Sequence, residues 1–241
     1  MKIVPLGDSA LIVRLRDELH AQPELAVCEV IDAQRRLQAA AIPGVVELAP
    51  AYASIGVFFD PALVRRDPPA AAVFETLTNA IVTALAQPTG ARRPADASRE
   101  HELPVCCEGE FAPDLQLVAD LARLTAGEVV DRYCAAEYYV HCVGFLPGFP
   151  YLGGLPPELA APRRATPRTE VPARSVAIGG AHTGIYPTVS PGGWNIIGRT
   201  TARLFDPHRE RPSLLAAGDR VRFRKIPLGE FQALSAAAEA R

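Results

Sequence analysis

The sequence contains only two lysines, Lys2 and Lys225, and no glycine is followed by lysine. A P-loop needs the Gly-Lys pair of the GxxxxGK[ST] motif, so this class of phosphate-binding loop is excluded. The chain also lacks the GxSxG elbow of the α/β-hydrolases and the HExxH helix of zinc proteases. Because only two of the 25 basic residues are lysines, arginine carries nearly all of the positive charge.

No run of 18 apolar residues occurs, so no membrane helix is predicted. The opening MKIVPLGDSALIVRL is interrupted by Gly7 and Asp8 before a signal-peptide core can form. Five scattered cysteines show no CxxC spacing, which argues against a zinc site or a disulfide framework. The formal net charge of −2 indicates neither nucleic acid nor membrane as a partner. We expect a cytoplasmic protein with reduced thiols and no metal.

A length of 241 residues suits one large domain or two small ones. Residues 1–87 have the pattern of a small α+β domain in the order β-α-β-β-α, which one further strand would complete as a split β-α-β layer. Apolar spacing and β-branched content predict strands at 9–15, 44–50 and 53–60, and helices at 23–40 and 68–86.

Residues 88–100 are polar, contain proline and have no periodicity, so they are predicted to be a linker. A strand at 101–107 and a helical segment at 114–136 follow. Within that segment Thr125 precedes Glu128 by three residues, the spacing of a capping box that begins a second short helix.

The segment from Gly144 to Gly198 holds ten of the 18 glycines and nine of the 23 prolines. Long helices do not tolerate that density, but short strands joined by tight turns do. Strand candidates after Tyr138 predict a small β-barrel or sandwich: 138–145, 175–180, 195–200 and 220–226.

Charge is distributed unevenly between Tyr138 and Thr200. Glu158 and Glu170 are the only acidic residues there, whereas five arginines are present: Arg163, Arg164, Arg168, Arg174 and Arg199. Paired carboxylates of a glycosidase and a carboxylate-held metal are both improbable in this region. Guanidinium groups grip carboxylate or phosphate, so an anion site is favoured; the alternative is a solvated loop.

Trp194 follows the turn sequence Ser190–Gly193, where the glycines allow close backbone approach. This pattern fits either a pocket wall or a tight turn against a buried tryptophan. His182 lies in the glycine-flanked GGAHTG and is a candidate acid-base group. His141 and Cys142 alternate along a strand, which makes them a poor base-nucleophile pair, so a structural role is favoured for His141.

Five stretches in a fixed order resemble the PxpB/KipI family, also called allophanate hydrolase subunit 1. They are GFLPGFPYLGGLP, PRRATPRTEVPARSVAIGG, HTGIYPTVSPGGWNIIGRT, LFDP and LLAAGDRVRF. The resemblance covers essentially the whole chain and is strongest from Tyr138 to Phe223. The family includes the PxpB subunit of 5-oxoprolinase and the sensor-kinase inhibitor KipI.

The resemblance implies an α+β fold with an N-terminal α+β domain (1–87), the linker (88–100), a C-terminal cyclophilin-like β-barrel (101–228) and a tail (229–241). It implies a hydrolase that is inactive alone and works with a PxpC-like and a PxpA-like subunit. Such a complex uses ATP to open 5-oxoproline to L-glutamate. ATP would then be held without a P-loop or by another chain.

The sequence pattern gives the candidate catalytic and anion-binding residues, and the resemblance adds a rim shared with a partner. His182 is the candidate catalytic residue, and four arginines are expected to bind the small-molecule substrate: Arg163, Arg164, Arg168 and Arg199. We expect an exposed pocket or partner rim formed by Pro147, Gly148, Phe149, Tyr151, Gly179, Gly180, Thr183, Tyr186, Ser190, Pro191, Gly192, Gly193 and Trp194.

Three positions depart from the usual family pattern, which has glycine, glycine and glutamine at Arg174, Ala177 and His182. These departures affect the identity of the expected substrate more than they affect the expected fold. Two alternatives remain: a KipI-type inhibitor that docks on a sensor histidine kinase, and a subunit of a carboxyltransferase or allophanate hydrolase.

Overall fold

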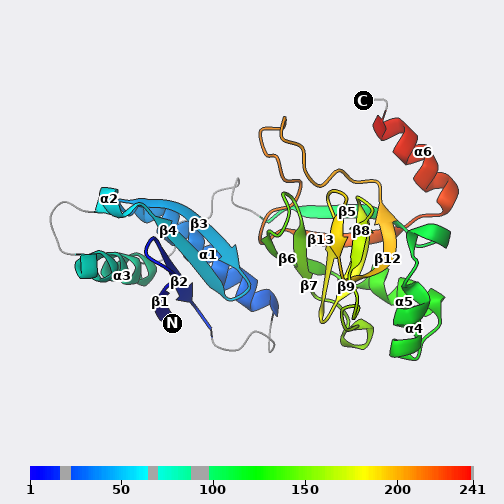
Figure 1. Ribbon diagram of the computed structural model, residues 1–241, viewed down its shortest axis with the longest axis horizontal. Helices are drawn as coiled ribbons and strands as arrows, with labels where there is room; N and C mark the ends of the chain where they lie inside the picture. The colour runs from blue at the N-terminus through cyan, green and yellow to red at the C-terminus, as the bar shows by residue number, and fades with distance from the viewer. Residues whose placement is uncertain (17–22, 65–69, 88–97, 240–241) are drawn as a thin grey trace. The chain divides into compact units, whose positions relative to one another are not determined.

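The computed structural model describes residues 1–16, 23–64, 70–87 and 98–239. The chain divides into two compact units, Met1–Ala97 and Ser98–Arg241 (Figure 1). The predicted α+β class is confirmed. Most of the predicted linker, residues 88–97, lies outside the described residues. No helix within the described ranges has the length and apolar character needed to cross a membrane.

The N-terminal unit is a four-stranded antiparallel sheet, in the order β1-β2-β4-β3, packed against two long helices. Its elements are β1 (Lys2–Pro5), β2 (Ala10–Arg14), α1 (Pro23–Ala40), β3 (Val45–Ala51), β4 (Ser54–Phe59), α2 (Pro61–Val64) and α3 (Ala70–Ala86). The predicted helix at 23–40 and the three predicted strands are confirmed. Strand β1 is the further strand that the pattern required, and α2 was not predicted.

Alternate residues of the central strands supply the core of this unit. Leu11 and Val13 of β2 and Ile55 and Val57 of β4 are buried with apolar residues of α1 and α3. Because successive strand residues point to opposite faces, one face of the sheet receives both helices. The apolar residues that recur at helical spacing and those that alternate along the strands are therefore buried in one common core.

The second unit is built on a closed seven-stranded barrel, in the order β10-β7-β6-β13-β5-β12-β9 (Figure 1). Its strands are β5 (Glu100–Cys106), β6 (Tyr138–Val143), β7 (Pro150–Gly153), β9 (Ser175–Gly179), β10 (His182–Ile185), β12 (Asn195–Thr200) and β13 (Arg220–Lys225). A separate two-stranded ribbon pairs β8 (Arg168–Val171) with β11 (Ser190–Gly192). All strands pair antiparallel except β13 with β5, which are parallel.

Two helices and the interior of the barrel share one core. Helix α4 (Leu115–Ala122) and helix α5 (Ala126–Ala135) contribute buried residues to the cluster that fills the barrel. The predicted capping box is confirmed, because the Thr125 hydroxyl accepts from the Glu128 amide while the Glu128 carboxylate accepts from the Thr125 amide. Short 3-10 helices lie at Gly109–Phe111 (η2) and Pro157–Leu159 (η3).

The residues predicted to form a tail belong to helix α6 (Leu228–Glu239). Phe231 of this helix is buried with Cys106 and Ile226, and its ring packs on Phe111 at 4.6 Å between centroids. Helix α6 is therefore anchored to β5 through an apolar contact.

The loop predicted around His182 is a tight β-hairpin instead. His182 is the first residue of β10 and pairs with Gly179, the last residue of β9. Two residues make the turn, and Gly180 has a φ of +67°. Gly180 is the first of the two turn residues, the position that takes glycine with positive φ in a type II′ hairpin, while Gly179 belongs to the strand. His182 therefore lies in a strand, and its predicted placement in a loop was wrong.

Arg174 adopts a left-handed backbone conformation, with a φ of +66°, just before β9. Its amide donates to the Tyr186 carbonyl at 2.6 Å, and its carbonyl accepts from the Thr200 amide at 3.0 Å. Neighbouring strands thus hold this backbone in a conformation that costs a non-glycine residue about 1–2 kcal/mol.

We expect Arg174→Gly to raise the free energy of unfolding by about 0.5–1 kcal/mol, because relief of strain exceeds the entropy that glycine adds to the unfolded chain. Arg174→Ala is the matched control: it removes the same side chain but keeps the strain, so its stability should stay near that of the wild type. Urea unfolding measures both. Equal stability of the two variants would contradict a backbone origin.

Candidate functional site

The candidate site lies on the face of β9 opposite the barrel core. Val176 and Ile178 of β9 belong to the barrel core, whereas Ala177 between them belongs to a second buried cluster. Because strand residues alternate between faces, the second cluster packs against the outside of the barrel wall. We call it the aromatic cluster; its members are Phe149, Val171, Ala177, Tyr186, Trp194 and Ile196, with Leu146 and Tyr151 packed beside them.

Phe149 is the centre of the aromatic cluster. Its ring centroid lies 5.0 Å from Tyr151, 5.2 Å from Tyr186 and 5.6 Å from Trp194. Tyr186 and Trp194 meet it edge to face, a favoured arrangement of aromatic pairs. A fourth ring, that of the exposed Phe145, stands edge-on to Phe149 at 5.5 Å.

Glycines provide the surface on which these rings rest. A Cβ added at Gly179 would come within 2.5–2.6 Å of three indole atoms of Trp194. A Cβ added at Gly184 would lie 2.9 Å from the Phe149 ring. Both distances are too short for a real contact, so only glycine lets the rings lie flat against the strands. The glycine-rich, aromatic-rich sequence is thereby explained as close packing.

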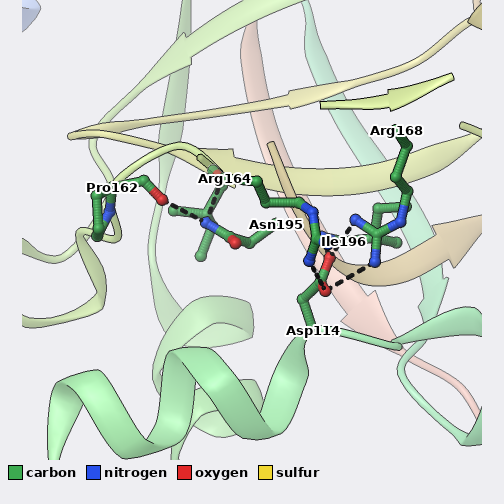
Figure 2. Close-up of polar contacts among 7 residues, drawn as sticks. Asp114, Pro162, Arg164, Arg168, Asn195 and Ile196 are labelled. Carbon is green, nitrogen blue, oxygen red and sulfur yellow. Dashed lines mark hydrogen bonds and ion pairs between the residues drawn. The ribbon is translucent and has the colours of Figure 1, made fainter. Parts of the chain in front are cut away.

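A buried carboxylate joins three segments beside the aromatic cluster (Figure 2). Asp114, 4% exposed, accepts a bidentate pair from Arg168 at 2.8 Å each, a hydrogen bond from Arg164 Nη1 at 3.0 Å and one from the Ile196 amide at 2.7 Å. We call Asp114, Arg164 and Arg168 the Asp114 clamp. Charge-assisted, bidentate contacts of this kind are among the strongest hydrogen bonds in proteins.

Asp114 was not predicted. It lies before α4, outside the segment in which acidic residues were sought, and 54 residues separate it from Arg168. It occupies the N-cap position of α4, yet its side chain makes no capping hydrogen bond. An aspartate before an apolar helix normally indicates a cap. Only the tertiary structure shows that this carboxylate is used for the arginines instead.

Two further contacts fix the loop that contains the arginines. The Asn195 side-chain amide donates to the Pro162 carbonyl at 2.8 Å, and the Arg164 amide donates to the Gly193 carbonyl at 2.8 Å. The PRRATPR loop is therefore bound to the start of β12 through backbone groups as well as through the Asp114 clamp (Figure 2).

The structure separates the four predicted anion-binding arginines into different environments. Arg164 and Arg168 are paired with Asp114, so their charge is already engaged within the chain. Arg163 places its guanidinium over the Trp194 ring at 5.6 Å. Arg199 stacks on Phe111 at 4.7 Å, and burial lowers the pKa of its guanidinium. Their role in substrate binding remains a prediction.

The rim expected to be exposed is mostly buried. Phe149, Tyr186 and Trp194 are 1%, 2% and 6% exposed, so they form a small core of their own. Thr183 points into the barrel, where its hydroxyl bonds with the Tyr133 hydroxyl at 2.8 Å. The remaining rim residues differ in exposure. Three are buried: Gly148, Gly179 and Ser190. Four are partly exposed: Tyr151, Gly180, Gly192 and Gly193. Two are exposed: Pro147 and Pro191. Of the two alternatives for Trp194, its burial favours a tight turn against a buried tryptophan over an exposed pocket wall, because the rings pack against each other where glycine has no Cβ.

His182 lies beside His141, with 6.1 Å between the ring centroids. His141 is buried above Gly153, where any Cβ would collide with its ring. Burial and, secondarily, the nearby His182 lower the pKa of His141 to about 4. His141 is therefore neutral near pH 7, in agreement with a structural role.

Thiol chemistry is not favoured at this site. Burial raises the pKa of Cys142 to about 11, so the thiol stays protonated at neutral pH and is a weak nucleophile. Within the described ranges, no group of three or more His, Cys, Asp or Glu side chains has the arrangement of a metal site. What the site offers is guanidinium charge beside packed aromatic rings.

The buried His141 predicts acid sensitivity. Its folded pKa of about 4 lies below the ordinary value of 6.5, so between these values the unfolded chain binds the extra proton. The free energy of unfolding should fall by about 2–3 kcal/mol as the pH drops from 6.5 to 4. His141→Gln should flatten this part of the profile in urea unfolding, whereas His208→Gln, at an exposed position, should not. An unchanged slope in His141→Gln would contradict the assignment.

Comparisons with known proteins agree with this architecture. A family model described as carboxyltransferase domain, subdomain C and D, matches residues 1–215. The B subunit of 5-oxoprolinase from Bacillus subtilis is 39% identical over 235 residues, which cover 96% of this chain and 95% of that protein. The protein of the same name from Haemophilus influenzae is 39% identical over 224 residues, covering 92% and 97%.

A solved structure shows the same fold. The protein TTHA0988 aligns with a TM-score of 0.73 and 34% identity over 90% of this chain. The chain spans 40% of the length of TTHA0988. The fold, the family model and the nearly full-length similarity to two 5-oxoprolinase B subunits all indicate the same family. The chain therefore belongs to the PxpB/KipI family of carboxyltransferase C and D subdomains.

Proposed function

We propose that this protein is the PxpB-type component of an ATP-dependent 5-oxoprolinase that opens 5-oxoproline to L-glutamate. The observation that carries the proposal is the 39% identity to the 5-oxoprolinase B subunit of Bacillus subtilis over nearly the full length of both chains. Similarity over both of its structural units makes a shared role more plausible than similarity confined to a common barrel.

The chemistry of the site supports a subunit that does not act alone. Asp114 is engaged by two arginines and a backbone amide, His141 is neutral and buried, and the Cys142 thiol is protonated. None of these groups is placed as a general base or nucleophile. His182 is the remaining candidate for proton transfer. We propose that a PxpC-like and a PxpA-like subunit complete the site and supply the binding of ATP.

A carboxyltransferase activity is the second candidate, because the matching family model carries that description. The two candidates differ in substrate. An oxoprolinase consumes 5-oxoproline and ATP, whereas a carboxyltransferase moves a carboxyl group between a carrier and an acceptor.

Reconstitution tests the proposal. The purified chain alone should form no glutamate from 5-oxoproline and ATP, because the described residues of the site do not make up a complete acid-base set. Addition of the PxpC-like and PxpA-like subunits should produce glutamate and ADP in equal amounts, and omission of this chain should abolish the activity. Glutamate is measured by chromatography and ADP by a coupled assay.

Two results would contradict the proposal. Full turnover by the lone chain would exclude a non-autonomous subunit. Full turnover by the partner subunits without this chain would exclude a role in the reaction.

A further inference from the structure

Arg163 differs from the two arginines of the Asp114 clamp. Its side chain is exposed, and its guanidinium carbon lies 5.6 Å from the centroid of the Trp194 ring. A guanidinium over an indole is held by the negative face of the ring, while its N–H groups remain directed outward from the ring edge. Arg163 is thus oriented by the aromatic cluster and leaves its donors available.

The charge of Arg163 has no counter-ion in the described part of the chain. Asp114 is occupied by Arg164 and Arg168, and Glu158 is paired with Arg132. The Asp114 clamp has two positive groups and one negative group, so it adds to the positive potential beside Arg163. Burial raises the pKa of the Tyr151 and Tyr186 phenols, and the nearby positive charge of Arg163 opposes this rise.

The backbone on both sides of Arg163 is fixed. The Pro162 carbonyl accepts from Asn195 at 2.8 Å, and the Arg164 amide donates to Gly193 at 2.8 Å. A ligand that binds Arg163 therefore loses little free energy to the ordering of the loop. An exposed, pre-oriented and unpaired guanidinium is suited to a planar anion that it can grip with two hydrogen bonds.

We infer that Arg163, held over the Trp194 ring, is a carboxylate-binding residue whose outward N–H groups receive the carboxylate of the substrate. This inference rests on the proposed function for the identity of the substrate, 5-oxoproline. The same chemistry could be supplied by an acidic side chain of the partner subunit. Asp114, Arg164 and Arg168 then act as positioning residues, because they hold the loop without touching the ligand.

Trp194 is the only tryptophan of the chain and lies beneath Arg163, so it reports on this position directly. Incorporation of 5-fluorotryptophan into this chain alone gives one ¹⁹F resonance, in the isolated chain and in the assembled complex. The probes are 5-oxoproline, 2-pyrrolidinone, which has the same ring without the carboxylate, and the PxpC-like subunit.

In the wild type, 5-oxoproline should shift the ¹⁹F resonance in the complex and 2-pyrrolidinone should not. Arg163→Gln should abolish the shift and raise the KM for 5-oxoproline at least about tenfold, the scale of a lost charge-assisted hydrogen bond, while the KM for ATP stays within about twofold. Arg163→Lys keeps the charge but not the fork, so it should fall between the two. Arg211→Gln, at another exposed arginine of the same unit, is the matched control and should behave as the wild type.

A second part of the experiment, with the PxpC-like subunit as the probe, determines whether the carboxylate comes from the substrate or from the partner. If the PxpC-like subunit shifts the resonance and Arg163→Gln weakens assembly at least about tenfold with an unchanged KM, the carboxylate belongs to the partner and the residue assignment stands. The inference is wrong if neither 5-oxoproline nor the partner subunit shifts the ¹⁹F resonance, or if the shift is unchanged in Arg163→Gln. Failure of the proposed function is distinct, since it appears as a wild-type complex that forms no glutamate, whatever the resonance shows.

Discussion

The Asp114 carboxylate accepts hydrogen bonds from two arginines of one loop and from the Ile196 amide of strand β12, and the arrangement of the candidate site depends on it. Without a negative charge at this place, Arg164 and Arg168 would bring two like charges into a half-buried position. Breaking a buried ion pair costs more than the pair contributes, because the remaining charge has no partner. The clamp thus fixes where the neighbouring Arg163 can lie.

Glycine and aromatic residues provide the second constraint. Trp194 can pack on β9 only because Gly179 has no Cβ, and Phe149 can pack on β10 only because Gly184 has none. The rings then form a small core on the outside of the barrel wall, and the guanidinium of Arg163 rests on its edge. Packing, rather than chain flexibility, explains the density of glycine, and it leads directly to an oriented cation.

Local signals in the sequence predicted much of the fold. The predictions of the helix at 23–40, the Thr125–Glu128 capping box and the strands at 175–180 and 195–200 depend on periodicity or on neighbours three residues apart. The site was harder to predict. The pairing of Asp114 with Arg168 crosses 54 residues, and the burial of Trp194 depends on which strand lies beneath it. Neither leaves a local pattern, and short strands such as β7 and β10 are defined by their pairing partners.

A double-mutant cycle between Asp114 and Arg168 tests most directly whether the clamp organises the site. Free energies of unfolding are measured in urea for Asp114→Asn, Arg168→Gln, the double variant and the wild type. If the two groups act as one unit, the double variant should lose about 1.5–3 kcal/mol less than the sum of the single losses. Additivity within about 0.5 kcal/mol would show that the two groups are independent, and would contradict the account.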